Sequence, residues 1–325
     1  MTDRALIRRY RLPSAEIRRL VEVVAPHVMR PTQQNFALSP EVQVLAALRF
    51  YACGSIFHMV GDGTALSKAS VSRCVAAVTP ILVRHARQHI QLPTTREEVR
   101  AVHQGFYDMA GIPRVMGLLD GTLIPLRNPV LVDPCWVCRK HFTALNVQVV
   151  VDDVGLIRDI VARWPGATHD AFMWENSSVG ERAARGEYGA SFFLGDSGYP
   201  LRTYLITPVP EPETPAEEAF NESHTTTRTH IERVFGRWKA RFRCLSRSAG
   251  GLRLPPLKAC QVIVVTAMLH NIAVRAGLPD VEQDEEDDED DDDQDPPLPP
   301  PGPHEPRNVL YQAGLRTRQA LIELF

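Results

Sequence analysis

Four acidic residues lie where their carboxylates could act together in chemistry. Asp120 and Asp196 each end an apolar run, VMGLLD and SFFLGD, that predicts a buried strand. Aspartate is a poor strand former, so its place at these strand ends favours a functional role. Asp170 follows another predicted strand at the point where a helix begins. Glu232 is the only acid in the basic helix predicted from Arg228 to Arg243.

Carboxylates that cluster repel one another and need a cation between them. Their hard oxygen atoms select magnesium or manganese among the common metals. Two such ions can activate a water molecule and stabilise the leaving oxygen of a phosphodiester. The basic residues around Glu232 would then bind the phosphate backbone. The four acids therefore predict a divalent-metal site with nuclease chemistry.

Each acid also has a structural explanation. These explanations are turn formation for Asp120 and Asp196, helix capping for Asp170, and ion pairing with Arg228 for Glu232. His169, next to Asp170, is interpreted as an orienting or core histidine rather than a ligand. A metal phosphohydrolase site built on His169 and Asp170 would need further histidines, which the motif lacks.

The charge is divided unevenly along the 325 residues. The whole chain carries 36 Lys and Arg and 39 Asp and Glu, a net charge of −3. Twelve of the acids, and no base, lie between Glu282 and Asp295, so the remainder has 27 acids against 36 bases, or +9. A basic body indicates a polyanion partner such as DNA, which the acidic run could screen. A solvated acidic linker beside a mildly basic enzyme explains the same pattern.

Membrane and export functions are not expected. The longest nearly apolar run, Val262 to Leu269, is far shorter than the roughly 20 residues of a membrane span. The start, MTDRALIRRYRLP, has arginine where a signal peptide has its apolar core. The six cysteines are therefore expected to be reduced thiols. Cys135 and Cys138 have the spacing of zinc ligands, but no second pair of ligands follows.

The sequence predicts four parts in order along the chain. They are a helical domain over 1–98, an α/β domain with a mixed sheet over 99–279, a disordered acidic and proline-rich linker over 280–306, and a C-terminal helix over 307–325. The α/β domain is predicted from four apolar, β-branched runs, VMGLLDGTLIPL, TALNVQVVVD, GLIRDIVARWPG and SFFLGDSGY. A long helix near Glu232 and an apolar helix from Leu257 to Ala276 follow them. The C-terminal helix is expected to dock on the rest of the chain.

Two helices of the N-terminal part have the outline of a helix-turn-helix. The first is predicted to start after Ser39 and to end at Gly54, and Ser67 caps the second. One face of the second helix is apolar, and its other face carries Lys68 and Arg73. This outline is typical of DNA-binding domains, although small helical bundles share it.

The order of strand Asp, strand Asp and helix Glu, with 35 residues between Asp196 and Glu232, matches the RNase H-like fold of DDE transposases. The local sequences resemble the PIF/Harbinger superfamily and the DDE endonucleases derived from it. The resemblance covers roughly Arg30 to Ala276 in unbroken order. Its motifs include GIPRVMGLLD, CRKHFTALNVQ, WPGATHDAF, FLGDSGYPLRTYLITP and TPAEEAFNESHTTTRTHIERVFGRWKARFRCL.

The resemblance implies a metal-dependent endonuclease that hydrolyses DNA and uses Mg²⁺ or Mn²⁺. It assigns metal binding to Asp120, Asp170, Asp196 and Glu232, with Asp120, Asp196 and Glu232 catalytic. It also implies a separate Myb-like DNA-binding partner protein and a location in nucleus and cytoplasm. The alternative is a transposase-derived DNA- or chromatin-binding protein that no longer cleaves DNA.

Overall fold

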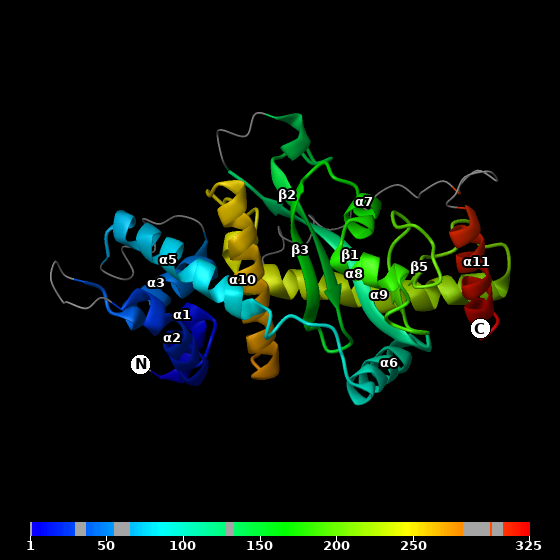
Figure 1. The fold of residues 1–325 in the computed structure, drawn as a ribbon, viewed down its shortest axis with the longest axis horizontal. Helices are drawn as coiled ribbons and strands as arrows, with labels where there is room; N and C mark the ends of the chain where they lie inside the picture. The colour runs from blue at the N-terminus through cyan, green and yellow to red at the C-terminus, as the bar shows by residue number, and fades with distance from the viewer. Residues whose placement is uncertain (1, 30–36, 55–65, 128–132, 282–299, 301–307) are drawn as a thin grey trace. The chain divides into compact units, whose positions relative to one another are not determined.

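The computed structural model describes residues 2–29, 37–54, 66–127, 133–281, 300 and 308–325 (Figure 1). The chain forms two compact units, each assembled from three stretches of sequence. The first unit comprises Met1–Ile90, Leu123–Leu145 and Gly236–Glu289, and the second comprises Gln91–Thr122, Asn146–Phe235 and Asp290–Phe325. The domain bounds that the sequence patterns indicate remain predictions. Residues 282–299 and 301–307 of the expected acidic and proline-rich linker lie outside the described residues.

The first unit is built mainly from helices. They are α1 (Asp3–Tyr10), α2 (Ser14–Val28), α3 (Pro40–Cys53), α5 (Lys68–Ala86) and α10 (Pro256–Arg275). The two predicted caps are confirmed. The Ser39 hydroxyl accepts from Val42 N at 3.3 Å at the start of α3, and the Ser67 hydroxyl accepts from Ser70 N at 3.1 Å at the start of α5. Each cap satisfies an amide that the first helical turn leaves without a partner.

Helix α5 has the two faces that its sequence predicts. Val71, Val78 and Leu82 are fully buried, whereas Lys68 and Arg73 are exposed. The segment between α3 and α5 spans residues 55–65 and lies outside the described residues. The helix-turn-helix therefore remains a prediction.

Helix α10 is the one described helix that is long and apolar enough to cross a membrane, judged by length and composition alone. Its most apolar 18-residue stretch is 67% buried in this structure. Side chains such as Ile263, Val265 and Met268 are completely buried, and α10 packs against α5 within the first unit. Packing in a protein core accounts for its apolar composition.

The sheet has five strands in the order β3-β2-β1-β4-β5. Their bounds are Val115–Pro125 for β1, Ala144–Val151 for β2, Ile157–Pro165 for β3, Phe192–Leu194 for β4 and Leu205–Ile206 for β5. Strand β4 is parallel to both β1 and β5. A tight turn, closed by Gly155 N donating to Asp152 O at 3.1 Å, joins β2 to β3 as the sequence predicts. This mixed sheet fits the RNase H-like fold.

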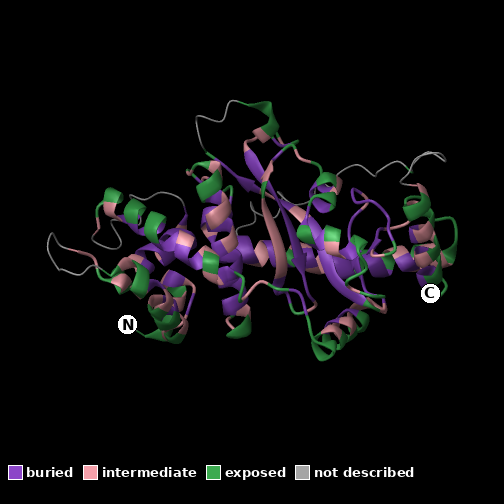
Figure 2. Cartoon of the chain, viewed as in Figure 1, coloured by how far each residue is buried: buried purple, intermediate pink, exposed green. Residues whose placement is uncertain are grey.

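Helices of the second unit cover the sheet. They are α6 (Arg96–Ala110), α7 (Asp170–Glu175), α8 (Ser178–Ala184), α9 (Pro215–Arg241, whose last residues belong to the first unit) and α11 (Asn308–Ile322). Trp174 of α7 and Val179 of α8 share an apolar core with Met116 of β1 and Phe193 of β4. Figure 2 shows β1 and β2 buried along most of their length and β3 half-buried. The three residues of β4 are buried as well.

Three features of the second unit differ from the sequence prediction. Strand β1 does not end at Asp120 but continues to Pro125. Helix α9 begins at Pro215, well before Arg228. The reason is a capping box: Glu217 N donates to Thr214 Oγ1 at 3.3 Å, and Thr214 N donates to Glu217 Oε2 at 3.0 Å. The short elements β5 and α8 were not predicted from the sequence.

The C-terminal helix α11 docks on the second unit, as expected. Arg318 is only 7% exposed, and its Nη1 donates to Thr207 O at 3.2 Å and to Pro208 O at 2.7 Å, just after β5. Gly314 allows close approach, because a Cβ there would lie 3.0 Å from Arg202 N. The buried guanidinium and the absent side chain at Gly314 thus contribute to the docking of α11, together with the buried side chains of Leu321 and Ile322.

Replacing Arg318 with alanine should destabilise the fold by about 1.5–3 kcal/mol, the usual worth of hydrogen bonds to a charged group. The carbonyl oxygens of Thr207 and Pro208 would lose their hydrogen-bond donor in the contact between α11 and the segment after β5. Equilibrium unfolding in urea measures this change. Arg316→Ala is the matched control, because Arg316 is exposed on the same helix. Equal effects of the two substitutions would contradict the assigned role of Arg318.

Candidate metal centre

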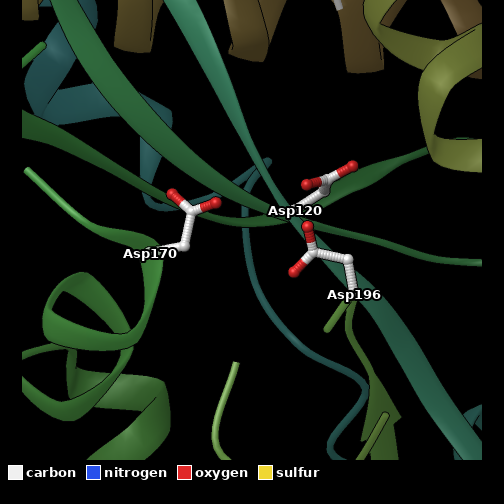
Figure 3. Close-up of side chains that lie close together, drawn as sticks. All are labelled: Asp120, Asp170 and Asp196. Atoms are coloured by element: carbon white, nitrogen blue, oxygen red, sulfur yellow. The ribbon is translucent and has the colours of Figure 1, made fainter. Parts of the chain in front are cut away.

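Three aspartates meet at one end of the central strands. Asp120 lies in β1, and Asp196 lies two residues beyond β4. Leu118 of β1 pairs with Leu194 of β4 in the parallel register, so Asp120 and Asp196, two residues further on in each chain segment, lie level with each other. Asp170 is the first residue of α7. One carboxylate oxygen from each aspartate lies within 4.8 Å of the other two (Figure 3).

The three side chains are largely removed from water. Their residues are 9%, 5% and 2% exposed for Asp120, Asp170 and Asp196. Burial raises the pKa of Asp120 well above its usual range, and the nearby charges of Asp196 and Asp170 raise it further. The Arg228 guanidinium and the Gly121 amide act in the opposite direction. A cation at this cluster would relieve both the burial of charge and the mutual repulsion.

Main-chain amides orient two of the carboxylates. Gly121 N donates to Asp120 Oδ1 at 2.8 Å, and Gly198 N donates to Asp196 Oδ1 at 3.0 Å. These hydrogen bonds favour the ionised form of each acid, because a carboxylate accepts more strongly than a protonated carboxyl group. The amides therefore fix the direction of the carboxylates that face one another.

Asp170 is oriented by the neighbouring strand. Asn146 of β2 donates from Nδ2 to Asp170 Oδ1 at 3.0 Å and to Thr168 O at 2.9 Å. Gly121 provides the space for this carboxylate, because a Cβ there would lie 2.6 Å from Asp170 Oδ1. His169 occupies the N-cap position of α7, so Asp170 is a first-turn residue rather than the cap.

Glu232 does not belong to the compact cluster of three aspartates. It lies on α9, where Arg228 Nη2 donates to Glu232 Oε1 at 2.6 Å. The ion pair that offered a structural explanation for Glu232 is thus present. Arg228 also links Glu232 to the cluster, because its Nη1 lies 3.5 Å from Asp120 Oδ2 and 3.9 Å from Asp196 Oδ2.

The structure thus brings Asp120, Asp170 and Asp196 together. Glu232 is linked to them through the guanidinium of Arg228. Asn146 was not identified from the sequence as a site residue, and Arg228 was considered as a phosphate-binding residue or as the ion-pair partner of Glu232, not as a neighbour of the aspartates. A signal for Asn146 was available, since Asn146 and Gln148 are the polar residues of the otherwise apolar run ALNVQVVV. Two polar side chains on one face of a buried strand indicate a polar site beside it.

The donor set fits a divalent metal. Three buried carboxylates provide hard oxygen ligands of the kind that Mg²⁺ and Mn²⁺ prefer. In the part of the chain that the structure describes, this is the only group of three or more His, Cys, Asp or Glu side chains compact enough to hold a metal ion. Cys135, exposed, and Cys138, buried, are outside it.

Comparisons with known proteins agree with this chemistry. A family model described as DDE superfamily endonuclease matches residues 119–271, a range that includes all four acids. The protein named "Putative nuclease HARBI1" from Homo sapiens is 40% identical over 278 residues, which cover 86% of this chain and 80% of the relative. The protein of the same name from Xenopus laevis is 34% identical over 283 residues, covering 87% and 82%. "Protein ALP1-like" from Arabidopsis thaliana is 25% identical over 255 residues, covering 73% and 61%. No solved structure matches the chain significantly.

Asp120→Asn should stabilise the metal-free protein at neutral and higher pH. Because its pKa is raised, folded Asp120 keeps a proton at pH values where the unfolded chain has released it, so its contribution to stability is lost as the pH rises. Asparagine removes this loss, and Arg228 keeps two carboxylate neighbours. In the presence of a chelator at pH 8 we expect the variant to melt about 2–4 °C above wild type. A gain of about 1 kcal/mol in the free energy of unfolding gives a shift of this size in domains of roughly 150–250 residues.

The same thermal melts test the metal. Mg²⁺ should raise the melting temperature of the wild type and have less effect on Asp120→Asn. Glu222→Gln, which neutralises an exposed carboxylate on α9, should behave as wild type. A lower melting temperature of Asp120→Asn than of wild type in chelator at pH 8 would show that repulsion is not the dominant force at this cluster.

Proposed function

The chain belongs to the DDE superfamily endonucleases, and from this membership we propose that it is a divalent-metal-dependent nuclease that hydrolyses DNA phosphodiester bonds. The observation that carries the proposal is the convergence of three buried aspartates from strand β1, the start of helix α7 and the segment after β4. The resemblance predicted from the sequence motifs is confirmed by the family match and by the identity over most of the chain.

Asp120, Asp170 and Asp196 would hold Mg²⁺ or Mn²⁺. The bound metal would supply Lewis-acid chemistry, activating water and stabilising the leaving oxygen of the phosphodiester. The protein's own contribution is to fix the positions of the three carboxyl groups so that they face one place. Gly121 and Gly198 do so through their amides, and Asn146 through its side chain.

Glu232 is proposed as the catalytic carboxylate that orients the attacking water, together with Asp120 and Asp196. Its position on α9, beside Arg228, puts it next to the aspartate cluster without being part of it. A carboxylate that is near the cluster yet 33% exposed in its side chain has access to water, as a general base requires.

An arginine-lined cavity of the first unit is a place where DNA phosphates could bind. Its volume is about 710 Å³, and its lining residues are Thr2, Arg4, Ala5, Arg8, Arg9 and Arg49. Arg49 Nη1 donates to Arg9 O at 3.1 Å, which fixes its position on the wall. Nearby, the pKa of Arg11 is lowered, mainly by burial and then by the charges of Arg49 and Arg243. Such a gathering of positive charge attracts a phosphate backbone.

A Myb-like DNA-binding partner, and a location in nucleus and cytoplasm, complete the proposal. Both are supported by the PIF/Harbinger resemblance and not by a described contact of this chain. A transposase-derived protein that binds DNA without cutting it is the alternative.

Plasmid nicking tests the nuclease activity. We expect the wild-type protein to nick supercoiled DNA with Mg²⁺ or Mn²⁺ and not with EDTA. Asp196→Asn should reduce the rate by about 100-fold or more, because loss of a metal ligand removes several kcal/mol of transition-state stabilisation. Asp108→Asn, which changes an exposed aspartate of α6, is the matched control.

Two outcomes would contradict the nuclease proposal. Equal nicking by wild type and Asp196→Asn would indicate a contaminating nuclease. A folded wild-type protein that binds metal and DNA but never nicks would favour the non-enzymatic alternative.

The double variant Arg4→Gln and Arg8→Gln should weaken binding to a nonspecific DNA duplex by about tenfold at low salt, with a shallower dependence on salt. Each phosphate contact that is lost reduces the number of counterions released from the DNA on binding. Fluorescence anisotropy over a salt series measures both effects. Arg18→Gln with Arg19→Gln removes the same charge from the exposed surface of α2 and should change affinity less. Equal losses in the two double variants would leave the cavity with no special role.

A further inference from the structure

Arg228 is a buried cation in direct reach of three acids. It is 7% exposed, and its two terminal nitrogens face different carboxylates. Nη2 forms the 2.6 Å ion pair with Glu232, one turn later on α9. Nη1 lies 3.5 Å from Asp120 Oδ2 and 3.9 Å from Asp196 Oδ2. The guanidinium therefore joins Glu232 to two members of the aspartate cluster.

Nη1 is fully buried and has no hydrogen-bond partner among the residues that the structure describes. Its distances to the two aspartates are those of charge attraction rather than of well-formed hydrogen bonds. A buried donor without a partner is costly, so a firmly bound guanidinium would normally close such gaps. This arrangement lets Arg228 neutralise the aspartates while remaining weakly attached to them.

Arg228 and a divalent metal would use the same oxygens. Arginine stays protonated at all accessible pH values, so Arg228 cannot lose its charge when a metal arrives. A metal bound to Asp120 and Asp196 would place two further positive charges beside the guanidinium. In a buried site such repulsion is poorly screened. Binding of the metal to the aspartates therefore weakens their attraction to the guanidinium, and the guanidinium weakens the binding of the metal.

We propose that Arg228 is an internal counter-cation that competes with the divalent metal for Asp120 and Asp196. This inference rests on the proposed function, since it takes the aspartates to be the metal site. Arg228 stabilises the metal-free fold, and it raises the metal concentration that the site needs. Metal binding moves the guanidinium away from the aspartates.

The ion pair with Glu232 gives the competition a second effect. While Arg228 holds Glu232 Oε1 at 2.6 Å, the glutamate is kept out of the aspartate cluster. A metal that displaced the guanidinium from Asp120 and Asp196 would also alter the position of the Glu232 carboxylate, because the same guanidinium holds it. Arg228 is thus a positioning residue, which couples the state of Glu232 to the occupancy of the metal site.

Calorimetric titration of Mn²⁺ into the full chain, without DNA, tests the competition. Arg228→Gln should bind Mn²⁺ about tenfold or more tightly than wild type, because the competing charge is gone. In the absence of metal it should melt at a lower temperature than wild type, and its gain in melting temperature on Mn²⁺ addition should be larger. Arg233→Gln is the matched control, since Arg233 is exposed on the same helix and its loss changes the net charge equally.

The outcomes separate this inference from the proposed function. Mn²⁺ affinity of Arg228→Gln equal to that of Arg233→Gln, or weaker than wild type, would overturn the competition while leaving the metal centre in place. Absence of Mn²⁺ binding by folded wild-type protein would instead overturn the metal centre itself, and the competition with it. If Arg228→Gln does not fold without metal, Arg228→Met, which keeps much of the buried volume, must show the tighter binding.

Discussion

Repulsion among the buried carboxylates of Asp120, Asp170 and Asp196 is the constraint around which the second unit is organised. Three carboxyl groups with oxygens within 4.8 Å of one another and out of water would disperse on ionisation if the chain allowed it. The chain prevents this by placing the acids in β1, at the start of α7 and just beyond β4, and by giving each carboxylate a hydrogen-bond donor. The energy that holds the acids together comes from strand pairing and helix packing elsewhere.

The strand order explains how residues so distant in sequence come to meet. Strand β4 returns to lie parallel beside β1, so the ends of both strands point to the same edge of the sheet. Helix α7 starts at that same edge, and α9 crosses the sheet, donating through His224 to Ile206 O at 3.4 Å and through His230 to Asp152 O at 3.1 Å.

The sequence allowed the four acids, the helix caps and the β2–β3 turn to be predicted, because each has a local signature. It misplaced the end of β1, since the Asp120–Gly121 pair resembles a strand end and the continuation to Pro125 depends on the neighbouring strands. That Glu232 shares the metal site remains a prediction, and the ion pair with Arg228 that the sequence offered as its structural explanation is present. The ion pair joins residues four apart on one helix, whereas the approach of Arg228 to Asp120 and Asp196 joins residues far apart in the chain and has no local signature.

Strand β5 forms one edge of the sheet and contains only two residues. An uncovered sheet edge offers unpaired backbone groups to other chains and promotes aggregation. Helix α11 lies against β5, and Arg318 donates hydrogen bonds to the carbonyl oxygens of Thr207 and Pro208, which follow β5. Helix α11 therefore shields an edge formed about a hundred residues earlier in the chain. During synthesis this edge has no covering helix until α11 has left the ribosome, so a chain that terminates before α11 would leave β5 uncovered.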